Sequence, residues 1–135
     1  MNLIPINAAQ IDFAWQDGAH VLKEACDTSG GEITGDQLKL ILSRGERILL
    51  RLDDDGKKVG WAVVRIDQLP NMRVMMVTDL VAPGGYFHRC LEPLRAMSRS
   101  IGCSVIRCAA KPAQARLYQM KCGFEPVYQI LEVKV

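Results

Sequence analysis

The chain has 135 residues, 49% of them hydrophobic and 24% charged, which is enough apolar material for one globular domain over residues 1–135. Its formal net charge of +2 is too small, and its basic residues are too scattered, to indicate a nucleic-acid-binding protein. No apolar run reaches the roughly 18 residues of a membrane span, and no signal-peptide pattern opens the chain, so we expect a soluble protein made in a cytoplasm.

The cysteines and histidines give no metal-binding or nucleophilic pattern. The five cysteines are Cys26, Cys90, Cys103, Cys108 and Cys122, an odd number without a C-x-x-C pair. Most lie within apolar patterns, where a free cysteine packs as a small hydrophobe. A nucleophilic cysteine would need a neighbouring base, and no cysteine is paired with a histidine by spacing. We therefore expect buried thiols and no metal site.

The first third of the chain predicts one edge strand and two helices. Leu3–Ile6 is apolar but contains a proline, which favours an edge strand. From about residue 9 to residue 26, apolar side chains recur at helical spacing, with Gly18 weakening the middle. Thr34, followed three residues later by Gln37, is the capping-box pattern that begins a second helix.

Three strands are predicted next. The apolar runs at residues 48–52 and 59–66 flank an Asp-Gly turn, which is typical of a β-hairpin. The three aspartates before that glycine predict a solvated turn rather than a calcium loop, because no distal glutamate follows. A third strand from about Arg73 completes an antiparallel meander, and its run from Val74 to Val81 is apolar enough to be covered on both faces.

A glycine turn follows this central strand. Pro83 ends the strand, and Gly84 with Gly85 lets the backbone turn sharply into a helix that begins near Tyr86. Backbone N–H groups at such a turn point toward one spot, which suits a phosphate or a carboxylate. Further along, the pattern predicts a strand at residues 104–110, a helix from Pro112 to Cys122 and a terminal strand from Phe124 to Val135.

This order of elements is similar to the GNAT family of acyl-CoA-dependent N-acetyltransferases, which has an α/β (α+β) fold with a mixed central sheet. The residues that carry the resemblance are Val81-Ala82-Pro83, the glycine turn, and Ala113 to Tyr118 leading into Cys122-Gly123-Phe124. The resemblance implies acetyl-CoA between the two parallel central strands, with backbone N–H groups holding the thioester oxygen. The implied coenzyme contacts are Leu80, Val81, Gly84, Gly85, His88 and Arg89.

The pyrophosphate loop departs from the family pattern Val-x-Pro-x-x-Arg/Gln-x-x-Gly-x-Gly/Ala. Anchored on Pro83, the expected arginine or glutamine is Tyr86, and the two glycine positions are Arg89 and Leu91. Phe87 lies between Tyr86 and Arg89, at a position that the pattern leaves open. We expect these side chains to obstruct the backbone cradle, which makes the chain a degenerate member. Gly84 and Gly85, with His88 or Arg89, offer the alternative of a displaced cradle.

The catalytic positions also differ. The family places a proton-donating tyrosine four residues before a Gly-Phe pair, where this chain has Gln119, with Tyr118 beside it. Tyr118 is either a general acid or a buried structural tyrosine. Asp79 is a candidate base, because burial would raise the pKa of its carboxyl group, or else a carboxylate that caps a neighbouring turn or pairs with an arginine. The 12 residues from Phe124 to Val135 leave an acceptor wall that is reduced or completed by another chain.

Three functions follow. We favour a non-catalytic binding or assembly component without cofactor, in which Tyr86, Phe87, His88 and Arg89 form a protruding patch for a protein partner or a second copy. Its size and degraded loop also resemble GNAT-like internal virion proteins of short-tailed phages, which implies a place in a virion. The alternative is an acetyl-CoA-dependent N-acetyltransferase acting on an unknown amine. A nucleic-acid binder would use Arg95, Arg99, Arg107, Lys111 and Arg116, and the small net charge disfavours it.

Overall fold

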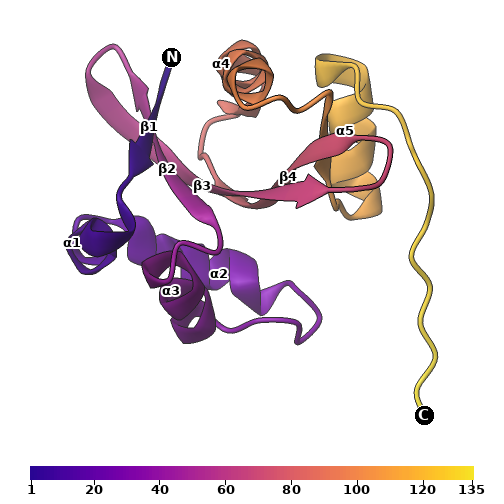
Figure 1. Cartoon of the computed structure of the whole chain (residues 1–135), viewed down its shortest axis with the longest axis horizontal. Coiled ribbons are helices and arrows are strands. Elements are labelled where there is room, and N and C mark those ends of the chain that lie inside the picture. Colours follow the sequence, from indigo (N-terminus) through magenta and orange to yellow (C-terminus); the bar gives the residue numbers. More distant parts are fainter.

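A computed structural model describes all residues from Met1 to Val135 and has one five-stranded sheet with helices on both faces (Figure 1). The strands, in their order across the sheet, are β1 (Asn2–Ile6), β2 (Ile48–Asp54), β3 (Lys57–Gln68), β4 (Arg73–Val81) and β5 (Val105–Cys108). The α-helices are α1 (Ile11–Gln16), α2 (Leu22–Asp27), α3 (Gly35–Ser43), α4 (Phe87–Ser100) and α5 (Pro112–Cys122), with 3₁₀ turns at Ala8–Gln10 and Ala19–Val21. None of the helices combines the length and apolar character that crossing a bilayer requires.

The N-terminal region matches the predicted strand but not the predicted single helix. β1 lies at the sheet edge and pairs only with β2, so the edge position expected for Pro5 is confirmed. The helix predicted for residues 9–26 is divided into α1 and α2, because Gly18 has a φ of +136° that a helix does not accommodate. A side chain at this glycine would also lie 3.3 Å from the indole nitrogen of Trp61.

The capping box and the hairpin are both confirmed. Thr34 Oγ1 accepts from the Gln37 backbone N–H at 3.2 Å, and Gln37 Oε1 accepts from the Thr34 N–H at 2.9 Å. At the hairpin turn, Asp55 and Gly56 have φ values of +51° and +77°, as the two central residues of a tight hairpin turn require. Local sequence chemistry therefore sets both the start of α3 and the register of β2 with β3.

The sheet opens at the end of β4. Val63 of β3 lies opposite Asp79, while the next residue, Val64, lies opposite Val77, so Thr78 is an extra residue that forms a β-bulge. β5 runs parallel to β4 and pairs with it only over Val74 to Val77. The last four residues of β4 thus have no strand partner on the side of β5. The two parallel strands separate there, as the GNAT resemblance implies.

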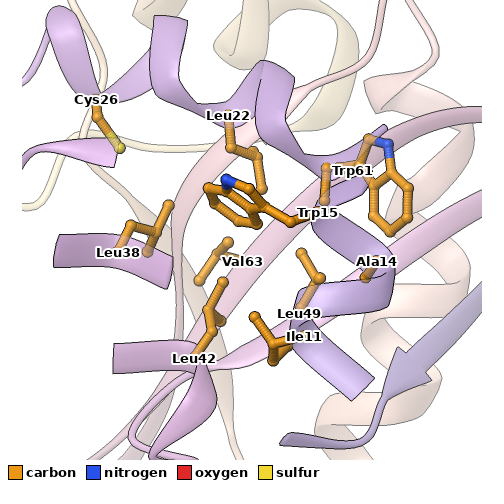
Figure 2. Close-up of a cluster of buried hydrophobic side chains, with 11 residues drawn as sticks. Ile11, Ala14, Trp15, Leu22, Cys26, Leu38, Leu42, Leu49, Trp61 and Val63 are labelled. Carbon is orange, nitrogen blue, oxygen red and sulfur yellow. The ribbon is translucent and has the colours of Figure 1, made fainter. Parts of the chain in front are cut away.

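Two hydrophobic cores cover the two faces of the sheet. Because side chains alternate along a strand, Leu49 and Val63 belong to one core while Leu50 and Val64 belong to the other. The first core packs the sheet against α1, α2 and α3, and Figure 2 shows its side chains gathered around Trp15. The second core packs the sheet against α4 and α5. Each face therefore has its own set of helices and its own set of candidate site residues.

The predicted terminal strand is absent. After Phe124, whose N–H donates to the Tyr118 carbonyl at 3.3 Å, residues 125–135 make no backbone hydrogen bond within the chain. We call Phe124–Val135 the C-terminal tail; it runs in an extended path past α5 and away from the sheet (Figure 1). Its apolar pattern is that of a strand, but a strand is stable only when it pairs with a neighbour, and the tail has none in a single chain.

Replacing Leu38 by alanine should destabilise the fold far more than the same change at Leu40 on the same helix. Leu38 is fully buried in the first core, whereas Leu40 is 50% exposed. We expect Leu38→Ala to lower the free energy of unfolding by about 2–5 kcal/mol and Leu40→Ala by less than about 0.5 kcal/mol. Urea unfolding followed by circular dichroism measures both. Equal losses at the two positions would contradict the described orientation of α3.

Candidate functional site

The backbone after β4 has the shape expected for an anion-binding turn. Gly84 and Gly85 have φ values of +82° and +76°, and α4 begins at Phe87 without a side-chain cap from Tyr86. The Arg89 N–H donates to the Tyr86 carbonyl at 3.0 Å, so the N–H groups before it are left without a helical acceptor. The backbone alone would therefore suit a phosphate. The side chains around it decide whether one can approach.

Phe87 closes the space beside this turn. Its side chain is only 7% exposed, and its ring centroid lies 4.6 Å from that of Tyr118 on α5 and 6.0 Å from that of Phe124. We call these three rings the aromatic cluster. They pack in the same core as Leu80, near the end of β4, and Cys108, at the end of β5. The cluster thus belongs to the same core as the ends of β4 and β5.

Arg89 is held by a carboxylate of the same chain. Its Nη2 donates to Asp54 Oδ1 at 2.9 Å, and its Nη1 lies 2.5 Å from Asp54 Oδ2, which is a two-point ion pair. The guanidinium also lies 5.7 Å from the centroid of the Tyr86 ring. Asp54 is 8% exposed, which corrects the prediction that all three turn aspartates are solvated. Its spacing from Leu50 and Leu52, two residues at a time, was the signal that it shares their buried face.

The predicted protruding patch is therefore smaller than expected. Phe87 points into the core, so its assignment to a protruding contact patch is wrong. Tyr86 is half-buried, while His88 and Arg89 are exposed, and Arg89 is already paired with Asp54. The first residue of a helix can point inward as well as outward. Here the two aromatic partners on α5 and the tail determine that it points inward.

The largest groove lies elsewhere on the same face of the sheet. It has a volume of about 1170 Å³ and is lined by β5, α5, one side of α4 and the first part of the C-terminal tail. The predicted coenzyme contacts are not part of its lining; these are Leu80, Val81, Gly84, Gly85, His88 and Arg89. The glycine turn and the groove are thus two separate features. The aromatic cluster contacts both, because Phe87 follows the turn while Tyr118 and Phe124 line the groove.

Tyr118 is shared between the cluster and the groove. It is half-buried, and burial raises the pKa of its phenol, with the neighbouring Cys108 and Cys122 adding to the effect. A phenol with a raised pKa is protonated at neutral pH but gives up its proton less readily than an ordinary tyrosine. Gln119, the residue at the family's tyrosine position, also lines the groove. Tyr118 thus both lines the groove and packs in the aromatic cluster, and its roles as general acid or structural ring stay predictions.

Asp79 lies on the opposite face of the sheet. Its carboxylate accepts from Thr78 Oγ1 at 2.8 Å, lies 3.8 Å from Arg47 Nη1 and accepts from the Cys26 thiol at 3.9 Å. Cys26 is on α2, so Asp79 faces the first core, while Tyr118 packs in the second. The two candidate catalytic residues are not brought together. The geometry is that of the alternative stated for Asp79, a carboxylate paired with an arginine.

The cysteines are free thiols, four of them buried, as the sequence predicted. Burial raises the pKa of Cys26 to about 11, with the nearby Asp79 carboxylate adding to the shift, and burial raises the pKa of Cys90 to about 11 as well. No three histidine, cysteine, aspartate or glutamate side chains come together in a group that would hold a metal ion. These thiols are packing residues rather than nucleophiles.

Several solved structures with the same architecture are acetyltransferases by name. The crystal structure of a probable acetyltransferase has a TM-score of 0.69 and 14% identity, covering 100% of this chain and 97% of that one. An aminoglycoside acetyltransferase from an uncultured soil metagenomic sample has a TM-score of 0.67 and 12% identity, covering 99% of this chain and 95% of that one. The chain has the GNAT fold. A ribosomal-protein-alanine N-acetyltransferase from Brucella melitensis biovar Abortus matches at a TM-score of 0.66 and 12% identity over 100% of both chains.

The similarity shows the shared fold rather than a shared activity, because the identities are far below the level at which site residues are retained. No protein-family model matches the chain, and no curated protein matches it in sequence. The GNAT fold predicted from the order of elements is confirmed. The state of the site has to be judged from this chain's own side chains.

If Arg89 serves Asp54, its removal should cost stability. We expect Arg89→Ala to lower the free energy of unfolding by about 1–3 kcal/mol, because it removes both guanidinium contacts of the buried Asp54 carboxylate and leaves it only the N-terminal ammonium of Met1, 3.8 Å away. Arg95→Ala is the matched control on the same helix, since Arg95 pairs with Glu92 at the surface. That change should cost less than about 0.5 kcal/mol. Indistinguishable urea midpoints would contradict the structural assignment of Arg89.

The raised thiol pKa values predict slow chemistry at Cys26 and Cys90. A pKa of about 11 leaves roughly a hundredth of the thiolate that an ordinary cysteine holds at pH 8. We expect both residues to resist a disulfide-exchange reagent at pH 8 in the native chain and to react fully in denaturant. Mass mapping of the labelled sites measures this. Rapid native labelling of either residue would contradict their burial.

Proposed function

We propose that this chain is a non-catalytic GNAT-fold protein that acts as a binding or assembly component without acetyl-CoA. The observation that carries the proposal is the aromatic cluster, in which Phe87 packs against Tyr118 and Phe124. The family pattern has glycine, or alanine at the second, at the positions of Arg89 and Leu91 and leaves the Phe87 position open, so that the backbone beside the turn stays accessible. A buried phenylalanine instead gives this region the packing of a hydrophobic core.

Electrostatics support the same proposal. A pyrophosphate carries negative charge that needs N–H groups and cationic side chains close by. Arg89 already forms a two-point ion pair with Asp54, and that carboxylate adds a negative charge beside the first turn of α4. His88 is the other side chain named for a phosphate, and it is exposed beside Arg89. A coenzyme would have to displace an existing ion pair as well as packed aromatic rings.

A partner is part of this proposal. A fold that keeps its core while losing its ligand site still offers surfaces for binding other macromolecules. The resemblance to GNAT-like internal virion proteins of short-tailed phages makes assembly into a virion one form of this role. A protein partner would meet Tyr86 and His88 at the exposed side of the turn, with Arg89 contributing the part of its guanidinium that faces solvent.

The alternative is an acetyl-CoA-dependent N-acetyltransferase acting on an amine. The observation that favours it is Tyr118, a protonated phenol at the wall of a large groove. In this alternative the chain's own residues would hold acetyl-CoA at the separated ends of β4 and β5, and Tyr118 would donate a proton to the leaving thiolate. It requires the aromatic rings to move apart when the coenzyme enters.

Thermal unfolding with acetyl-CoA tests the proposal. A ligand at a hundredfold excess over its Kd stabilises a protein by about 2.7 kcal/mol, which raises the Tm of a small domain by several degrees. We expect no shift in Tm with millimolar acetyl-CoA, because the rings and the Arg89–Asp54 pair already fill the site. A saturable rise in Tm would overturn the non-catalytic proposal.

A matched pair of variants then tests the alternative. If acetyl-CoA binds, the acetylation of model amines should fall strongly in Tyr118→Phe and remain unchanged in Tyr128→Phe, since Tyr128 is 70% exposed on the tail. Binding without this difference would leave Tyr118 as a structural ring.

A further inference from the structure

At the β5 side of the sheet, two strand-pairing surfaces remain unused in a single chain. β5 pairs with β4 along one edge only, so the N–H and C=O groups along its other edge have no strand partner. The C-terminal tail is extended, and its residues 125–135 make no backbone hydrogen bond. Such open edges readily pair with another strand.

The tail is also strongly apolar and exposed. Its largest hydrophobic side chains are between 61% and 86% exposed up to residue 133: Val127, Tyr128, Ile130, Leu131 and Val133. These residue types favour strands, and the proline of the tail lies before them, at position 126. Soluble monomers rarely leave so many neighbouring apolar side chains in water. The tail thus has the composition of a buried strand without the cover of one.

The groove lies between these two surfaces. β5 forms one wall, and the tail up to Leu131 lines the groove as well. The tail does not fill the groove from its own side, because it forms part of the wall and because Phe124 anchors its start in the aromatic cluster. An extended segment from outside the chain would gain β5 as a strand partner.

We propose that this segment is the C-terminal tail of a second copy of the chain. Each tail would enter the groove of the other copy and pair with its β5, and the two tails would lie antiparallel beside each other across a two-fold axis. Across the joined sheet, β5 of one copy would be followed by the tail of the second copy, the tail of the first copy and β5 of the second copy. One sheet would then run through both copies. The exchange gives both β5 edges and both tails strand partners at once around a two-fold axis, and it leaves as edges only the two β1 strands, which contain Pro5.

Charge complementarity favours the tail as occupant. The groove is lined by Arg95, Arg99, Arg107 and Arg116, while Glu125 is its one acidic residue. The tail has two acidic residues, Glu125 and Glu132, and one basic residue, Lys134. Its apolar side chains would meet the apolar lining of the groove, and its net negative charge would meet the arginines.

This inference is independent of whether acetyl-CoA binds, because it uses the β5 edge and the tail rather than the glycine turn. It has one consequence for the site. The partner's tail would cover the groove wall that contains Tyr118, so a second copy would complete this side of each chain. The proposed exchange is one way in which another chain would complete the acceptor wall, as expected from the sequence.

The molar mass in solution tests the exchange. We expect the wild-type chain to have twice its 15.0 kDa mass by light scattering after size exclusion. Ile130→Lys should reduce the mass to 15.0 kDa, because a charged side chain replaces an apolar one in the paired strand. Leu40→Lys is the matched control, an exposed leucine on α3 away from the tail, and it should remain dimeric. Circular dichroism should show both variants folded, since Ile130 and Leu40 are 84% and 50% exposed in the single chain.

Hydrogen exchange distinguishes tail exchange from any other dimer. The tail amides of residues 127–133 should be protected in the wild-type dimer and unprotected in Ile130→Lys. Three results would overturn the proposal. They are a monomeric wild-type chain, a dimer whose tail amides exchange freely, and an Ile130→Lys variant that stays dimeric with a protected tail. A monomer with a protected tail would instead mean that the tail pairs with β5 of its own chain.

Discussion

The packing of Phe87 against Tyr118 and Phe124 is the constraint on which the account of this chain depends. These rings join the first turn of α4 to α5 and to the start of the tail, and each pair adds about 0.5–1.5 kcal/mol beyond the burial of its surface. They belong to the core that also contains Leu80 near the end of β4 and Cys108 at the end of β5. The chain keeps the GNAT fold, and the proposal that it does not use acetyl-CoA rests on this packing.

The architecture explains why the remaining candidates do not form one catalytic site. The bulge at Thr78 and the short β5 give the sheet its opening, but side chains alternate across the sheet. Asp79 faces α2 and is paired with Arg47, whereas Tyr118 faces the groove on the other side. Arg89 completes an internal ion pair with Asp54. Each polar group that resembles catalytic machinery thus has a structural partner, and Tyr118 alone also reaches the groove.

Much of the fold could be predicted because local chemistry determines it. Thr34 and Gln37 define a helix start, Asp55 and Gly56 define a hairpin, and the order of elements identifies the GNAT fold. The failures lie where distant parts of the chain decide the outcome. A periodic pattern does not show that Gly18 breaks a helix against Trp61.

The site was harder to predict for the same reason. The sequence shows a bulky Phe87 just after the glycine turn, but its burial depends on two rings more than 30 positions further along the chain. The partner of Arg89 lies 35 residues away on β2. For the terminal strand, the pattern was present but a pairing edge within the chain was not, so a strand-like sequence remained as an exposed tail. A sequence pattern indicates the structure that a segment prefers locally, whereas the site is formed by contacts between elements that are far apart in the sequence.

The most direct measurement is an amide NMR titration of the chain with coenzyme A, followed at Gly84, Gly85 and Tyr86. These backbone N–H groups would hold the pyrophosphate if the turn still bound it. We expect no saturable shift of these signals, because Phe87 beside the turn is packed against Tyr118 and Arg89 is held by Asp54. Saturable shifts at these residues, accompanied by movement of the Phe87 and Tyr118 ring signals, would contradict it.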